Sequence, residues 1–166
     1  SSSSRQIYWI RQDRKEELIM TSALVTDFYE LTMMQGYFLE HHNPRVVFDM
    51  FYRTNPFNGG YTIFTGLEEL VTKLEEFRFS KEDIEYLRSL GKFQESFLDY
   101  LSSYRFTGDL YAFDEGTPAF PQEPLIRIET NMLDAQLIES ILLNTINFQT
   151  LIATKASRMK LATKGK

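Results

Sequence analysis

Cysteine is absent from the 166 residues of this chain. Disulfide bonds, thiolate nucleophiles and cysteine metal sites are therefore excluded. Long apolar runs are missing too. No apolar stretch approaches the ~20 residues that a helix needs to cross a bilayer. Basic residues are in deficit, with 18 Lys and Arg against 23 Asp and Glu and a net charge of −5. We therefore expect a cytoplasmic protein without membrane or general nucleic-acid partners, since phosphate neutralisation needs a basic excess.

Histidine is scarce as well, and the two that occur are adjacent, His41 and His42. They have no acidic residue at helical ligand spacing, so we interpret them as a loop pair and expect no metal site. The beginning of the chain lacks the apolar core of a signal peptide. Residues 1–21 are therefore interpreted as a flexible, tag-like leader, in which the charged stretch 5–19 could form a short helix.

The chain has enough apolar residues, 43% of the total, for one domain with a core or for one domain and the start of another. Its most informative stretch is 26–38, which predicts a helix. Asp27 followed by Glu30 resembles an acidic capping box. At helical spacing, the apolar residues of this stretch form two rows. The row that we expect to anchor the helix contains Phe28, Leu31, Met34 and Phe38. The row on the opposite side contains Tyr29, Met33 and Tyr37.

A helix that is apolar on nearly all sides is buried in its own domain, in a subunit interface or against a ligand. For Tyr29 the residues alone leave open a core position or contact with a flat substrate.

Strict alternation predicts a strand from Arg45 to Arg53. Val46, Phe48, Met50 and Tyr52 form the face expected to meet the core, whereas Arg53 lies on the other face. Arg53 is either a solvated strand end or a functional cation. The pair Gly59-Gly60 follows in a loop, where its backbone amides could cradle an anion or serve as a joint.

The remainder alternates between helical and strand patterns, which predicts an α+β fold. Ser80 with Asp83 resembles a capped helix start, and Gly91 ends that helix. Many amides and hydroxyls in the last helix indicate a polar network or ligand, because buried unpaired polar groups are costly. The expected helices are 66–77, 80–90, 93–104 and 132–161; the expected strands are 108–113 and 125–129, with an extended edge segment at 117–124.

Five segments, in order, resemble nicotinate phosphoribosyltransferases. They are Thr26–Tyr37 (TDFYELTMMQGY), Val47–Tyr61 (VFDMFYRTNPFNGGY), Phe77–Leu90 (FRFSKEDIEYLRSL), Phe106–Arg127 (FTGDLYAFDEGTPAFPQEPLIR) and Gln136–Arg158 (QLIESILLNTINFQTLIATKASR). The helix Glu139–Thr154 also resembles quinolinate phosphoribosyltransferases, a sister family in the type II fold group.

This resemblance implies ATP-coupled transfer of phosphoribose from phosphoribosyl pyrophosphate to nicotinate in NAD salvage. It also implies an open-faced N-terminal α/β domain followed by an irregular α/β barrel, in a head-to-tail homodimer. By resemblance, Tyr29 of the TD-x-Y motif stacks on the nicotinate ring of the neighbouring subunit's site, and Arg53 approaches phosphate across the same interface. Aromatic stacking and bidentate guanidinium–phosphate contacts suit these roles.

The family is much longer, so we expect an N-terminal fragment that is inactive alone and contains no catalytic residue. Residues 22–130 are expected to form the N-terminal domain and 131–166 the helical start of the barrel. The residues for ATP, Mg²⁺, pyrophosphate and the phosphorylated histidine would lie downstream. The alternatives are a non-catalytic α+β interaction module, or a relative that uses nicotinamide or quinolinate.

Overall fold

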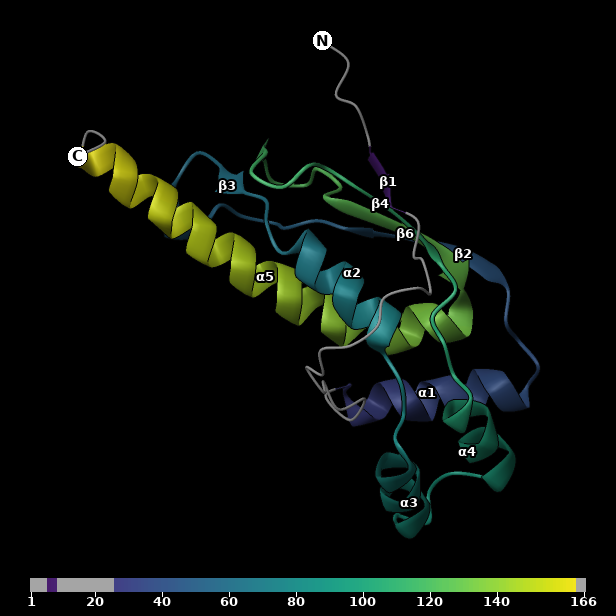
Figure 1. Cartoon of the computed structure of the whole chain (residues 1–166). Helices are drawn as coiled ribbons and strands as arrows, with labels where there is room; N and C mark the ends of the chain where they lie inside the picture. The colour runs from purple at the N-terminus through teal and green to yellow at the C-terminus, as the bar shows by residue number, and fades with distance from the viewer. Residues whose placement is uncertain (1–5, 9–25, 164–166) are drawn as a thin grey trace.

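The long helix α5 (Met132–Ala162) is the element around which the others pack (Figure 1). The structure, a computed structural model, describes residues 6–8 and 26–163. In chain order the other elements are β1 (Gln6–Tyr8), α1 (Phe28–Leu39), β2 (Arg45–Met50), a 3-10 turn (Pro56–Asn58), β3 (Thr62–Ile63), α2 (Leu67–Glu76), α3 (Lys81–Ser89), α4 (Glu95–Ser102), β4 (Asp109–Ala112), β5 (Pro118–Ala119) and β6 (Ile126–Asn131). The main sheet lies on one side of α5, and α1, α3 and α4 lie on the other (Figure 1). The predicted α+β class is confirmed.

The main sheet is antiparallel throughout, in the strand order β1-β4-β6-β2, and β3 pairs with β5 in a second, two-stranded sheet. The internal strand β6 alternates as predicted, because Ile126 and Ile128 are buried while Arg127 is exposed. The first residues of the predicted leader helix instead form β1, and the remainder of that segment lies outside the described residues.

Strand β2 differs from its prediction in length and burial. It ends at Met50 because the chain then leaves the ladder: the carbonyl oxygens of Met50 and Tyr52 accept from the Leu125 N–H (2.7 Å) and the Gln122 N–H (2.8 Å). Of the face expected to meet the core, Met50 is buried but Phe48 is 41% exposed. Strand β2 lies at the edge of the sheet and has a neighbouring strand on one side only, and four of its six residues are exposed.

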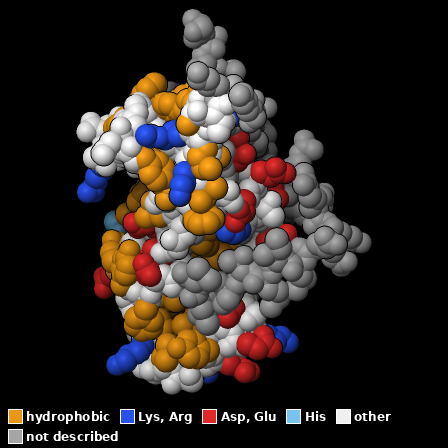
Figure 2. Space-filling view, turned by 90° about the vertical axis from the view of Figure 1, so that its left-hand side faces the viewer, with side chains coloured by type: hydrophobic (Ala, Val, Ile, Leu, Met, Phe, Trp, Pro, Cys, Tyr) orange, Lys and Arg blue, Asp and Glu red, His pale blue; other side chains and the backbone are white. Residues whose placement is uncertain are grey.

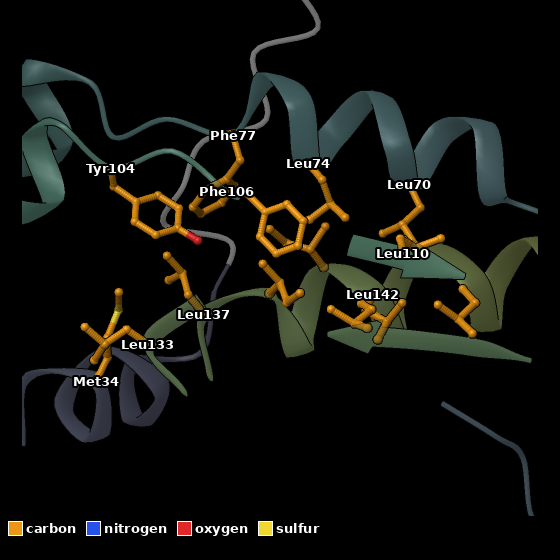
Figure 3. Close-up of a cluster of buried hydrophobic side chains, with 14 of the residues drawn as sticks. Met34, Leu70, Leu74, Phe77, Tyr104, Phe106, Leu110, Leu133, Leu137 and Leu142 are labelled. Atoms are coloured by element: carbon orange, nitrogen blue, oxygen red, sulfur yellow. The ribbon is translucent and has the colours of Figure 1, made fainter. Parts of the chain in front are cut away.

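The hydrophobic core lies between α2, the first half of α5 and the main sheet, and it extends to buried residues of α1, α3 and α4 (Figure 3). Leu70 and Leu74 of α2 point toward α5, Leu142 of α5 lies on the facing side, and Leu137 lies closer to Tyr104 (Figure 3). The prediction of an amphipathic helix at 66–77 is therefore confirmed. The first half of α5 belongs to the same core, whereas the division of a longer protein at residue 130 stays a prediction.

Two helix starts show how local and distant residues satisfy free backbone N–H groups. At α3 the predicted capping box is present: Ser80 Oγ accepts from the Asp83 N–H (3.0 Å), and Asp83 Oδ2 accepts from the Ser80 N–H (2.9 Å). At α2 the carboxylate of Glu115, distant in sequence, accepts from the backbone N–H groups of Leu67 and Glu68. Negative charge at a helix N-terminus is favourable.

The polar side chains in the second half of α5 are explained by the segment that carries β3. Thr154 Oγ1 accepts from the Ile63 N–H (2.9 Å), and Thr150 Oγ1 lies 3.3 Å from the Thr65 nitrogen. Ser157 Oγ lies 2.9 Å from Tyr61 Oη. Spaced by four and three residues, Thr150, Thr154 and Ser157 share one face of the helix. The predicted polar network is confirmed for Thr150 and Thr154, whose partner is the 61–65 segment, but it is wrong for Asn144 and Asn147, which are exposed.

No described helix, in residues 26–163, combines the length and hydropathy that a membrane span requires.

Candidate functional site

Helix α1 is anchored in the domain through the face that carries Leu31 and Met34, which determines how Tyr29 is presented. Leu31 and Met34 are buried, at 2% and 0% exposure, and Phe38 packs against Phe97 with a ring-centroid distance of 5.6 Å. The predicted anchoring row is confirmed for these three residues. It is wrong for Phe28, which is 50% exposed and packs edge-on against Phe93 with a ring-centroid distance of 5.7 Å.

The Tyr29 side of α1 faces outward. Tyr29 is 50% exposed and Met33 is 44% exposed, whereas Tyr37 is partly buried against the core. The negative charge of Glu139 on α5 is the main cause that raises the pKa of the Tyr29 phenol, and partial burial, Glu30 and Asp27 add to it. Tyr29 is therefore a neutral, half-exposed ring on an acidic part of the surface.

Glu30 occupies a buried position that the sequence did not indicate. Its exposure is 0%, and one carboxylate oxygen, Oε1, accepts from Ser140 Oγ at 2.9 Å. The other, Oε2, has no hydrogen-bond partner among the described residues. Burial raises the pKa of this carboxyl, against the opposing effect of the Ser140 hydrogen bond. The predicted capping box is wrong: Asp27 stands at the N-cap without a side-chain cap bond, because Glu30 points toward α5 instead.

Replacing Glu30 with glutamine is expected to change the pH dependence of stability. A raised folded-state pKa contributes stability that is complete below the unfolded pKa, about 4.3, and is lost as pH rises through the folded value. The unfolding free energy of E30Q relative to the native protein should therefore grow with pH in that window, by about 1.4 kcal/mol per unit of pKa difference. Urea unfolding between pH 4.5 and 8 measures this, with the exposed Glu82→Gln as control. Parallel curves for the native protein and E30Q would contradict it.

The loop between α1 and β2 contains the two histidines, and it is a helix end. His41 has a φ of 52°, its N–H donates to Phe38 O at 3.2 Å, and the His42 N–H donates to Tyr37 O at 2.9 Å. This is the Schellman pattern, with histidine where glycine is usual. The interpretation as a loop pair is confirmed. Among residues 6–8 and 26–163, no three His, Cys, Asp or Glu side chains are grouped so that they could hold a metal.

Arg53 lies three residues beyond the end of β2 and is exposed. The structure does not place it beside Tyr29. Tyr29 lies near Glu139, whereas the loop that follows Arg53 is attached to α5 at Ser157. The helix between these two positions spans roughly 27 Å. Within one chain, the two predicted substrate-binding residues therefore belong to different parts of the surface.

The loop after Arg53 adjoins a cavity of about 370 Å³, lined by Asn58, Gly59, Gly60, Tyr61, Arg158 and Leu161. The Gly59 N–H donates to Pro56 O at 3.0 Å, so this amide is used within the loop and does not serve an anion. Gly59 instead allows Arg158 to approach, since a Cβ there would lie 2.5 Å from Nη1. Sequence reasoning missed Arg158, because its position depends on a contact between residues 101 apart.

A second, larger cavity of about 610 Å³ lies between α2 and α5. Its charged groups are largely engaged within the chain. Lys73 Nζ lies 2.6 Å from Glu69 Oε1, Gln149 Nε2 donates to the other Glu69 oxygen, and Glu115 caps α2. Neither Tyr29 nor Arg53 lines this cavity or the smaller one.

Comparison with known proteins identifies the family. The family model of the nicotinate phosphoribosyltransferase N-terminal domain matches residues 24–147. A nicotinate phosphoribosyltransferase of Mycobacterium tuberculosis is 43% identical over 144 residues, which are 87% of this chain and 31% of the relative. The nicotinate phosphoribosyltransferase of Bacillus subtilis is 43% identical over 139 residues, which are 83% of this chain and 28% of the relative.

Comparison with solved structures gives the same family. The crystal structure of human nicotinic acid phosphoribosyltransferase matches with a TM-score of 0.77 and 31% identity, over 82% of this chain and 28% of that one. Nicotinate-nucleotide pyrophosphorylase from Pyrococcus furiosus shares the fold, with a TM-score of 0.65 and 22% identity over 92% of this chain and 33% of that one. The chain spans about a third or less of the length of these proteins. It belongs to the nicotinate phosphoribosyltransferase family and corresponds to the N-terminal domain of its members.

Proposed function

We propose that this chain is the substrate-covering and dimer-forming domain of an enzyme of NAD salvage. The enzyme transfers phosphoribose from phosphoribosyl pyrophosphate to nicotinate, coupled to ATP, and forms nicotinate mononucleotide and pyrophosphate. In a head-to-tail homodimer, Tyr29 stacks on the nicotinate ring in the partner's site and Arg53 contacts a phosphate across the same interface. In the full-length enzyme, residues downstream of Lys166 bind ATP and Mg²⁺.

The observation that carries this proposal is the presentation of Tyr29. A tyrosine that served only to pack α1 would be buried with Leu31 and Met34, but Tyr29 is 50% exposed on a helix that is anchored from its other side. Exposed aromatic rings on a rigid element suit a flat ligand, because stacking there costs little side-chain entropy.

The negative charge of the carboxylates near Tyr29 suits the positive charge that the proposed reaction creates on the nicotinate ring. The pyridine nitrogen forms a bond to the ribose C1 while the bond from C1 to pyrophosphate breaks, so the ring becomes a pyridinium cation. Negative charge near the ring favours that cation over the neutral pyridine. Glu139 and Asp27, together with the buried Glu30, supply negative charge on this side of α1.

The second half of α5 supports a further domain or subunit on this surface. Phe148, Ile152 and Met159 are 64%, 50% and 62% exposed, and their spacing places them on one face, opposite the polar residues that bind the 61–65 segment. Figure 2 views the molecule from the side toward which this end of α5 points, and hydrophobic side chains gather there, interrupted by Lys and Arg. We propose that the irregular α/β barrel of the full-length enzyme covers this face.

Replacing Arg53 with alanine tests the phosphate contact. In the full-length enzyme, the KM for phosphoribosyl pyrophosphate should rise about tenfold or more, since hydrogen bonds to charged groups contribute roughly 1.5–3 kcal/mol. Steady-state kinetics with each substrate varied measures it. Arg45→Ala is the matched control, because Arg45 lies at the other end of β2 and pairs with Asp109 at 2.8 Å. A change confined to thermal stability would favour the solvated strand-end interpretation.

The coding sequence beyond Lys166 tests the enzyme assignment itself. Glycine-rich phosphate-binding segments there would support it, whereas a natural stop codon would favour the non-catalytic interaction module. Assays with nicotinate, nicotinamide and quinolinate separate the substrate alternatives.

A further inference from the structure

The loop that follows Arg53 is attached to the last turns of α5 by Arg158 and Ser157. Arg158 Nη1 donates to the Phe57 carbonyl oxygen at 3.0 Å, and its guanidinium carbon lies 6.0 Å from the centroid of the Phe57 ring. Next to it, Tyr61 Oη lies 2.9 Å from Ser157 Oγ. Both ends of the loop Pro56–Tyr61 are therefore attached to one turn of the same helix.

The backbone that Arg158 holds is in an unfavourable conformation. Phe57 has a φ of 57° and Asn58 a φ of 49°, in the left-handed region. Asparagine tolerates this region, but a bulky residue such as phenylalanine adopts it only where contacts impose it. Arg158 contacts both the carbonyl oxygen and the ring of Phe57, so it acts on the strained residue itself.

The residue that precedes Arg53 in the chain, Tyr52, is also held in place by hydrogen bonds. Tyr52 Oη donates to Ala119 O at 2.6 Å and lies 3.1 Å from Asn55 Oδ1, and Tyr52 O accepts from the Gln122 N–H at 2.8 Å. Arg53 is thus presented between two attached points, and its side chain is exposed. Such a short span restricts where its guanidinium can lie.

We propose that Arg158 is a positioning residue for Arg53: by holding the strained Pro56–Tyr61 loop on α5, it places the Arg53 guanidinium where it contacts a phosphate of phosphoribosyl pyrophosphate in the partner's site. The inference rests on the proposed function of Arg53. The Nη1 group of Arg158 and the face of its guanidinium are engaged with Phe57, so the role assigned to Arg158 is to hold the loop.

The two adjacent glycines provide a matched pair of variants that leave the charge of Arg158 in place. At Gly59 an added Cβ would lie 2.5 Å from Arg158 Nη1 and 3.2 Å from Pro56 O, whereas at Gly60 it would meet nothing within 4 Å. Neither glycine has a positive φ, so alanine is conformationally acceptable at both. Gly59→Ala therefore displaces the guanidinium, and Gly60→Ala is its control.

The experiment compares R158A, G59A, G60A and R53A in the full-length enzyme. R158A and G59A should each raise the KM for phosphoribosyl pyrophosphate about tenfold, because small displacements of a binding group are costly, and should leave the KM for nicotinate within about twofold. G60A should match the native enzyme. In the R53A background, R158A should have almost no further effect, since its consequence passes through Arg53.

Hydrogen–deuterium exchange of the 53–61 segment provides a readout that does not depend on activity. Exchange should be faster in R158A and G59A than in the native protein and G60A. Equal exchange in all four would overturn the inference. If R53A raises the KM for phosphoribosyl pyrophosphate but R158A and G59A do not, the positioning role of Arg158 is wrong and the phosphate contact of Arg53 still holds. The same conclusion follows if the effects of R53A and R158A add. If R53A has no effect, the proposed phosphate contact fails as well.

Discussion

Replacing Tyr29 with alanine in the full-length enzyme is expected to raise the KM for nicotinate on the order of 5- to 150-fold, which corresponds to roughly 1–3 kcal/mol of lost ring contact. Tyr29→Phe should retain most of the affinity, because the stacking face is kept. The free energy of unfolding should change little in either variant, since Tyr29 is 50% exposed and Leu31 and Met34 hold the helix.

The control for Tyr29 is another exposed tyrosine, Tyr86 on α3, which is 54% exposed. Tyr86→Ala should leave both Michaelis constants unchanged. Steady-state kinetics at fixed phosphoribosyl pyrophosphate, together with thermal unfolding of each variant, gives the two readouts. If Y29A and Y86A behave alike, Tyr29 is an ordinary surface residue and the ring-stacking proposal is wrong. If Y29A loses stability without a change in KM, its role is packing.

Replacing Phe97 with alanine is expected to produce the largest loss of stability, about 3–5 kcal/mol, which is the usual range for a buried aromatic residue. Phe97 is 0% exposed and lies at the centre of an aromatic cluster. Its ring centroid is 5.6 Å from that of Phe38 on α1, 5.9 Å from Phe93 and 6.4 Å from Tyr100. Truncation removes these contacts and leaves a cavity between α1 and α4.

Phe97→Leu is the graded control, because leucine fills part of the volume and should cost less than alanine. Urea unfolding followed by circular dichroism measures both. Because the cluster supports the end of α1 opposite Tyr29, F97A should weaken the whole domain. A loss below about 1 kcal/mol for F97A would show that the site collapses around the smaller side chain.

Local sequence patterns predicted the structure correctly where it depends on residues that are close together in the chain. Ser80 and Asp83 form the predicted capping box because both partners lie within one helical turn. The leucines of α2 and the isoleucines of β6 are buried as their periodicities predicted, because each lies on an element with one covered face. The family motifs allowed the resemblance to be stated from the residues, and the match over 24–147 confirmed it.

Predictions failed where a distant segment decided the outcome. Glu30 has the spacing of a capping residue, but its carboxylate binds Ser140, 110 residues away. Phe28 belongs to the apolar row of α1, yet it is half exposed and packs edge-on against Phe93. The polar side chains of α5 indicated a network without naming its partner, which is the 61–65 segment.

The sequence by itself determined the family, the class of fold, most helices and strands, and the two residues expected to meet substrate. Periodicity and capping depend on groups a few residues apart, and these are readable in order along the chain. Only the tertiary structure decided that Tyr29 faces outward, that Glu30 is buried under it, and that Arg158 holds the loop beside Arg53. The burial and the hydrogen-bond partners of a side chain depend on segments that are distant in the sequence, and a local sequence pattern does not predict which segments these are.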